Sequence, residues 1–154
     1  RVDRIPGVAH PASSTTILSR SSRPASASSA PSRAARNEPD ARLVCVDPSD
    51  GGLEWHETLE WIERIDGREE PMSPYRGSLL AVDRQFLCLG ELGHLLWLDL
   101  SPKGVKELAR TWLFAARESW ALPVLSHGLL YVCQNARDVI NKTGPRLLCY
   151  DLRA

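Results

Sequence analysis

Short apolar runs separated by polar turn residues fill the chain from residue 41 onward. Three of these runs have one form, in which a few apolar residues end in an aspartate: LVCVD at 43–47, LLWLD at 95–99 and LLCYD at 147–151. The three aspartates are spaced 52 residues apart, twice in succession. Apolar runs of this length, bounded by turn residues, are typical of β-strands. The equal spacing therefore predicts a structural unit that is repeated along the chain.

The segments around the later runs complete this unit. Two short apolar segments, joined by a turn, come before each of them, and a fourth strand is expected after each aspartate. The expected upstream strands are 78–82 and 85–90 in the second unit and 121–125 and 129–134 in the third. The expected fourth strands are 53–56 in the first unit and 105–113 in the second.

The segment 105–113 has an alternative. Ser101 suits the residue that caps a helix, Pro102 suits the first helical position, and the apolar residues that follow have helical spacing. A helix over 102–118 would make the chain a small α+β domain. The corresponding segment after Asp47 alternates between apolar and polar residues, so the repeat favours a strand.

Units of four short antiparallel strands, repeated about every 40 to 50 residues, are the signature of a β-propeller, in which each unit is one blade. Stacked blades cover each other's apolar faces. We therefore expect an all-β fold, a partial β-propeller of four-stranded antiparallel blades, with about two blades plus part of a third over residues 41–154. Residues 63–73 carry many charges and are expected to form a loop between blades.

The first 40 residues are mainly Ser, Ala, Pro and Arg, with few large aliphatic residues. Such a segment cannot bury enough apolar surface to offset its chain entropy, so it is expected to be disordered. The chain thus divides into a disordered segment, 1–40, and a propeller part, 41–154. Because 27–40 is too rich in proline, serine and arginine for strands, we expect the chain to be the C-terminal part of a longer propeller protein.

Charge and cysteine content exclude several classes of protein. Lys plus Arg and Asp plus Glu number 19 each, so no net field attracts nucleic acid. No apolar run approaches the roughly 20 residues that span a bilayer, so no membrane span is expected. The cysteines lie within apolar runs and form no CxxC pair, which predicts free, structural thiols and no disulfide framework or metal site. These cysteines are Cys45, Cys88, Cys133 and Cys149.

Residues 47–55, DPSDGGLEW, fit the pattern D-x-x-x-G-x-x-x-W. This pattern resembles the blade motif of the quinoprotein-like propellers, the PQQ-like repeat family. The resemblance implies that Asp47 and Gly51 shape the turn between the third and fourth strands of a blade. It also implies that Trp55 docks against the neighbouring blade. The equivalent positions of the later units, which lack the tryptophan, are Asp99, Gly104 and Asp151.

The resemblance also bears on location and chemistry. It implies a ring closed by an outermost strand from the opposite end of the chain, and a place in the bacterial cell envelope or periplasm. Enzymes of this superfamily bind pyrroloquinoline quinone with a Ca²⁺ ion, and the alcohol dehydrogenases among them carry a disulfide between adjacent cysteines, a pair that this chain lacks. No nucleophile or phosphate-binding motif is present. Because His56, His94 and His127 are expected at exposed strand ends or turns, we expect no catalytic, cofactor or metal site.

Two functions follow from these expectations. The first is a non-catalytic scaffold that binds a protein or a small ligand through its loops, with the remaining blades of a longer parent chain as further partners. The alternative is the C-terminal part of a quinone-dependent dehydrogenase that lacks its catalytic blades. The expected contact of the scaffold is the long polar loop 135–144. Its candidate contact residues are Asn135, Arg137, Asp138, Asn141 and Lys142.

Overall fold

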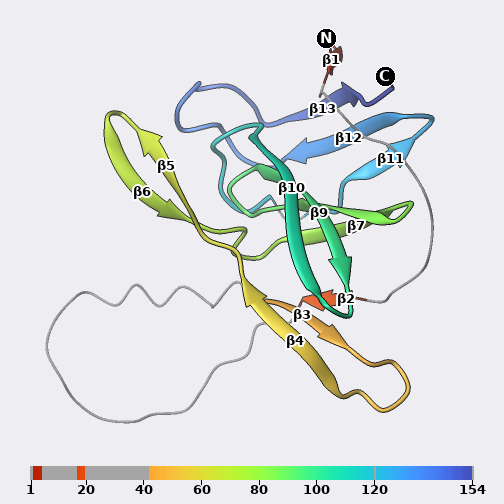
Figure 1. The fold of residues 1–154 in the computed structure, drawn as a ribbon. Coiled ribbons are helices and arrows are strands. Elements are labelled where there is room, and N and C mark those ends of the chain that lie inside the picture. Colours follow the sequence, from red (N-terminus) through yellow and green to blue (C-terminus); the bar gives the residue numbers. More distant parts are fainter. Residues whose placement is uncertain (1, 5–16, 20–41, 120, 154) are drawn as a thin grey trace, which may run out of the picture.

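A computed structural model of the protein describes residues 2–4, 17–19, 42–119 and 121–153 (Figure 1). Within these residues the chain forms thirteen strands and no helix, so the expected all-β fold class is confirmed. The strands are β1 Val2–Arg4, β2 Ile17–Ser19, β3 Arg42–Val46, β4 Leu53–Thr58, β5 Trp61–Ile65, β6 Arg68–Met72, β7 Ser78–Val82, β8 Gln85–Leu89, β9 His94–Ser101, β10 Gly104–Trp112, β11 Val124–Ser126, β12 Leu129–Gln134 and β13 Arg146–Asp151.

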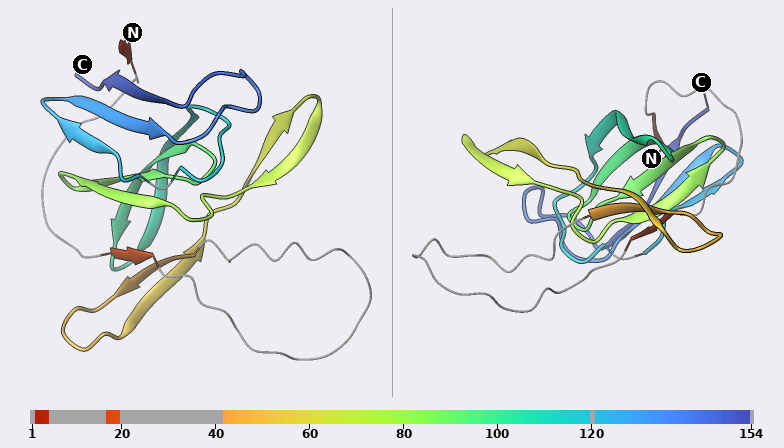
Figure 2. Two further views of the ribbon diagram at one scale, coloured as in Figure 1. Left: turned by 180° about the vertical axis from the view of Figure 1, so that it is seen from behind. Right: turned by 60° about the horizontal axis from the view of Figure 1, so that its bottom comes forward.

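The strands form three small stacked sheets and one separate hairpin (Figures 1 and 2). The first sheet has the order β2-β3-β4, the middle sheet β10-β9-β8-β7 and the third sheet β1-β13-β12-β11. Neighbouring strands are antiparallel except β1 and β13, which are parallel. This arrangement is consistent with a partial propeller-like fold, and the described residues do not close a ring.

The two central strands of the middle sheet, β8 and β9, are buried on both faces, and this explains their nearly continuous apolar sequence. Successive side chains of a strand point to opposite faces, so a strand covered on both sides needs apolar residues at every position. On one face, Leu96 and Leu98 pack with Leu43 of the first sheet. On the other face, Leu95 and Trp97 join the apolar core contributed by β12 and β13 of the third sheet.

Side chains at the same distance before each repeated aspartate face the same way in successive sheets. Residues one and three positions before Asp99 are Leu98 and Leu96, and they face the preceding sheet. The same positions before Asp151 are Tyr150 and Leu148, and they also face the preceding sheet. The repeated runs therefore occupy equivalent places in successive sheets.

The segment after Asp99 is a strand, and the alternative helix over 102–118 is wrong. Strand β10 pairs with β9 from Gly104 to Trp112, with a bulge between Glu107 and Ala109. A bulge adds one residue to a strand and shifts its alternation between faces. The apolar spacing that resembled a helix follows from this shift. In the third sheet, the first strand begins at Val124, later than expected, directly after the buried Pro123.

Two short strands come from the segment 1–40. Strand β2 pairs with β3 and supplies the upstream neighbour that the first blade was expected to lack, from a position earlier in the chain than 27–40. Strand β1 takes the outer edge of the third sheet, next to β13. The other residues of 1–40, among them 27–40, lie outside the described residues.

The charged segment 63–73 was expected to be a loop, and this prediction is wrong. Strands β5 and β6 pair over their full length and form a hairpin that projects from the stacked sheets (Figure 2). Asp66 and Gly67 form its turn with φ values of 50° and 79°. Two consecutive positive φ values match the twist of a two-residue hairpin, and Asp-Gly is a preferred sequence for it. The many charges of this segment, most of them exposed, hid this signal in the sequence.

Candidate functional site

The turn after β3 is built around Asp47. The carboxylate Oδ1 of Asp47 accepts a hydrogen bond from the backbone N–H of Ser49 at 2.8 Å. The backbone N–H of Gly51 donates to the Asp47 carbonyl, and the Asp47 N–H donates to Gly52 O, both at 2.8 Å. The hydrogen bonds from the backbone and side chain of Ser49 lower the pKa of Asp47. Asp47 and Gly51 thus lie in a turn whose polar groups are satisfied locally.

The other two aspartates differ from each other. Asp151 forms the same contact as Asp47, because its Oδ1 accepts from the Arg153 backbone N–H at 3.0 Å. Asp99 is an exposed residue within β9, so its expected place in a turn is wrong. Strand β9 continues two residues further, and Ser101 Oγ accepts from the Lys103 N–H at 3.2 Å in the turn before Gly104.

Trp55 lies between the first and middle sheets. Its indole Nε1–H donates to the carbonyl oxygen of Ser101 at 2.7 Å, and its ring packs against the core that includes Leu43 and Leu98. The motif residues of the first unit therefore hold a turn and join two sheets. They do not gather reactive groups in one place.

The loop 135–144 connects β12 and β13 and projects from the end of the third sheet (Figure 1). The buried Gln134 fastens both ends of this loop. Its side-chain Nε2 donates to the carbonyls of Ala136 at 2.8 Å and Thr143 at 2.7 Å. Its Oε1 accepts from Arg146 Nε at 3.0 Å. The amide of Gln134 thus ties the start of the loop, at Ala136, to its end, at Thr143, and to Arg146 at the start of β13.

Asp138 is fully buried inside the loop. Its Oδ1 accepts from the N–H groups of Ile140 and Asn141 at 2.8 Å each, and its Oδ2 accepts from Asn141 Nδ2 at 2.9 Å. Burial alone would raise the pKa of this carboxyl, but the hydrogen bonds from Asn141 and Ile140 outweigh burial and lower the pKa to about 2. The carboxylate therefore acts as the internal anchor of the loop.

The expected contact residues of the loop are engaged within the protein. Asn135 Nδ2 donates to Glu118 O at 2.6 Å, Arg137 Nε donates to Lys142 O at 2.9 Å, and Lys142 Nζ donates to Val139 O. The exposed large apolar side chains of the loop are Val139 and Ile140, which are 59% and 46% exposed. Sequence reasoning missed them, although two apolar residues in a row within a polar loop were a readable signal.

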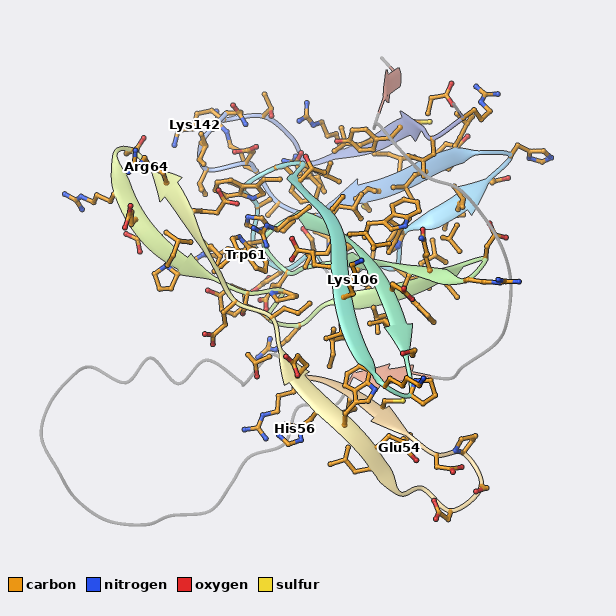
Figure 3. All side chains as sticks on the ribbon, viewed as in Figure 1. Glu54, His56, Trp61, Arg64, Lys106 and Lys142 are labelled. Atoms are coloured by element: carbon orange, nitrogen blue, oxygen red, sulfur yellow. The ribbon has the colours of Figure 1, made fainter. Side chains whose placement is uncertain are left out.

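His94 was expected to be exposed, and it is fully buried. Its ring stacks on Trp112 at 4.7 Å between centroids and meets the edge of Trp61 at 5.0 Å. Neither ring nitrogen has a hydrogen-bond partner among the described residues, and Glu63 Oε1 lies 3.6 Å from Nε2. Figure 3 shows Trp61 at the base of the β5–β6 hairpin, toward the middle sheet. The side chains of His56 and His127 are exposed, as expected.

Burial is the main cause of the low pKa of His94, about 4, and the positive charge of Arg110 adds to it. The Glu63 carboxylate would favour the protonated ring, but it remains in contact with water while the ring does not. Its attraction is therefore weaker than the cost of burying a charge. A neutral ring between two tryptophans packs as an aromatic side chain and attaches the hairpin to the middle sheet.

The four cysteines are free. Cys45 and Cys88 are buried, and burial raises the pKa of the Cys88 thiol to about 12, so this thiol is a poor nucleophile at neutral pH. Cys133 and Cys149 are half-buried on β12 and β13. Across the described residues, no three His, Cys, Asp or Glu side chains are grouped so that they could hold a metal ion.

Comparison of the chain with protein-family models, with curated proteins and with solved structures found no match. None of the described segments forms a helix long and apolar enough to cross a membrane. The class of protein is therefore defined by its fold and loops alone: an all-β protein of stacked small sheets, with a loop over 135–144 that is held by its own hydrogen bonds.

Proposed function

We propose that the protein is a non-catalytic scaffold of the PQQ-like propeller repeat family that binds a protein partner through the loop 135–144. The observation that supports this proposal is the internal use of the loop's polar groups, from Gln134 to Lys142, while Val139 and Ile140 remain exposed. A loop held in one conformation loses little entropy when it binds.

The outward side chains of the loop suit a protein surface. Val139 and Ile140 form an adjacent apolar pair, and the exposed charged residues Arg137 and Lys142 lie on either side of it in the sequence. An apolar centre within a polar rim is the usual organisation of a protein interface. Complete burial of one such side chain contributes about 2 kcal/mol. A projecting tip fits a protein partner better than a small ligand, because small ligands are bound in concave sites.

The family part of the proposal rests on the motif and on the stacking. Asp47, Gly51 and Trp55 match the blade motif in sequence, and Trp55 contacts the neighbouring sheet. The repeated runs face equivalent neighbours in successive sheets. Membership of this family would also favour the bacterial cell envelope as the location of the protein.

The test is a photo-crosslinking experiment at the tip of the loop. A photoreactive phenylalanine analogue replaces Val139 in one variant and Leu108, a 40% exposed residue of β10, in a matched control. Crosslinking in an extract of the source organism, followed by mass spectrometry, should give one dominant partner protein for position 139 that is absent for position 108. The same products at both positions, or none at 139, would contradict the proposal.

Substitution is a sharper test than deletion of the loop. Deletion would remove the buried Asp138 and the bond from the Val139 N–H to Ala115 O, and would therefore disturb the fold. A Val139→Ser, Ile140→Ser variant keeps these contacts. It should lose the crosslinked partner from a pull-down, while its thermal unfolding remains within a few degrees of the wild type.

A further inference from the structure

The third sheet has one largely apolar face that the described residues cover only in part: Val124 and Leu147 are exposed, and Tyr131, Cys133 and Cys149 are half-buried. Residues Leu130, Val132 and Tyr150 point into the core shared with the middle sheet. Their neighbours along the strands point to the opposite side, which we call the terminal face. The strand register places these neighbours side by side across β11, β12 and β13. The terminal face consists of Val124, Tyr131, Cys133, Leu147 and Cys149.

The register of the repeat shows what kind of surface the terminal face is. Leu147 and Cys149 are four and two positions before Asp151. The same positions are Leu95 and Trp97 before Asp99, and Leu43 and Cys45 before Asp47. All four of these are at most 6% exposed, whereas Leu147 is 68% exposed and Val124 is 56% exposed. The terminal face thus has the positions that a following sheet covers in the first two units.

The first sheet, at the opposite end of the stack, exposes the surface that in the later units packs against a preceding sheet. In the first sheet, Val44 and Val46 are three and one positions before Asp47, and both are half-buried. The equivalent residues of the later sheets cover the sheet before them. Leu53, which pairs with Val46 across the strands, is 60% exposed. This surface, Val44, Val46 and Leu53, is called the leading face.

We propose that a second copy of this chain docks its leading face onto the terminal face, head to tail, as successive sheets do within one chain. One chain carries both halves of this contact, and its charge is balanced at 19 residues of each sign, so two copies do not repel. Two copies together have six sheets, within the range of about four to eight blades that closed propellers use. In a head-to-tail dimer the leading face of each copy covers the terminal face of the other. These two contacts close a ring, so neither terminal face stays exposed. The proposal is independent of the loop 135–144.

The first test is the mass of the 154-residue protein in solution, measured by sedimentation velocity over a range of concentrations. The wild type should be a dimer, and Leu147→Glu should be a monomer with an unchanged circular dichroism spectrum, because this side chain is exposed in the single chain. Leu108→Glu, at an exposed position of β10 outside both faces, should remain a dimer. A monomeric wild type would overturn the proposal. The terminal face would then be covered by another protein or by further blades.

The second test separates head-to-tail docking from two terminal faces packed on each other. Leu53→Glu lies on the leading face and should also give a monomer. A mixture of Leu53→Glu with Leu147→Glu should form a one-to-one complex, since each variant keeps one intact face that matches the other. A Leu53→Glu protein that stays dimeric would overturn the head-to-tail arrangement.

The third test uses the thiols of the terminal face. Cys133 and Cys149 should react with a maleimide at least tenfold more slowly in the dimer than in the Leu147→Glu monomer. The buried Cys45 and Cys88 should stay unreactive in both and serve as internal controls. Equal reaction rates of Cys133 and Cys149 in the two proteins would contradict docking at this face.

Discussion

At the scale of single residues, His94 and Asp138 show opposite ways to bury an ionisable group. Asp138 is charged and surrounded by hydrogen-bond donors, so its charge is stabilised where it lies. His94 has no donor or acceptor on its ring nitrogens and is held between two tryptophans, so its neutral form is favoured. Acidification therefore affects the two residues in different pH ranges.

His94 makes the protein less stable at mildly acidic pH. Its pKa is about 4 in the folded chain and 6.5 when exposed, so between these values the unfolded chain binds the extra proton. Stability is thus complete above about pH 6.5 and falls by on the order of 3 kcal/mol as the pH drops to about 4. His94→Phe should remove this part of the pH dependence, as measured by urea unfolding between pH 7 and 4. His127→Gln, at an exposed turn, should keep it; an unchanged slope in His94→Phe would refute the assignment.

Asp138 should be the residue of the loop that matters most for stability. Asp138→Asn replaces a charged acceptor of three hydrogen bonds, and it should lower the free energy of unfolding by about 2 kcal/mol at pH 7. The wild-type contribution is present above about pH 4 and is lost as the pH falls toward 2, because the folded pKa is lowered. Denaturant titration measures the loss. The matched change Asp99→Asn, at an exposed strand position, should cost less than about 0.5 kcal/mol, and equal costs would argue against the anchor role.

At the scale of elements, the β5–β6 hairpin and the β8–β9 turn both depend on residues with positive φ, but in different surroundings. Gly67, in the hairpin turn, has φ 79° and no atom within 4 Å of the place where a Cβ would lie. Gly93, before β9, has φ 86°, and a Cβ there would lie 2.2 Å from the carbonyl oxygen of Phe114. The first turn is free to accept a side chain at a conformational cost, whereas the second is packed against the core.

The two glycines give a matched pair of substitutions. Gly67→Ala should lower the free energy of unfolding by about 1 kcal/mol, because a residue with a Cβ is strained at a positive φ. Gly93→Ala adds a clash with backbone and should cost about 3 kcal/mol or more. Thermal and urea unfolding of both variants measures the difference. Similar costs would mean that the turn before β9 adjusts more easily than its packing indicates.

Much of the element pattern could be predicted from the sequence, and its errors have physical causes. The strands around 95–99 and 147–151 were predictable, because apolar period and turn residues are local signals. The β5–β6 hairpin was missed, since its charges masked the alternation and the Asp66-Gly67 turn. In the candidate loop, the polar residues were predicted as contacts, but local sequence does not show that side chains such as Asn135 are used inside the protein.

At the scale of the whole molecule, stacking explains why these short sheets are stable. A sheet with two apolar faces needs cover on both, and the middle sheet receives it from its two neighbours. The same rule leaves the terminal face and the leading face exposed in a single chain. The oligomeric state and the function of the loop are therefore questions about different surfaces of one molecule, and their tests do not depend on each other.

The sequence by itself determined the repeated strands and their phase, because the alternation of side chains along a strand is local and the aspartates mark it at a constant spacing. Only the tertiary structure decided the environment of particular residues: His94 buried between Trp61 and Trp112, and Asp138 buried inside its loop. The reason is that burial depends on which distant segments come together. A histidine beside a turn has the same local sequence signal whether a hairpin covers it or water does.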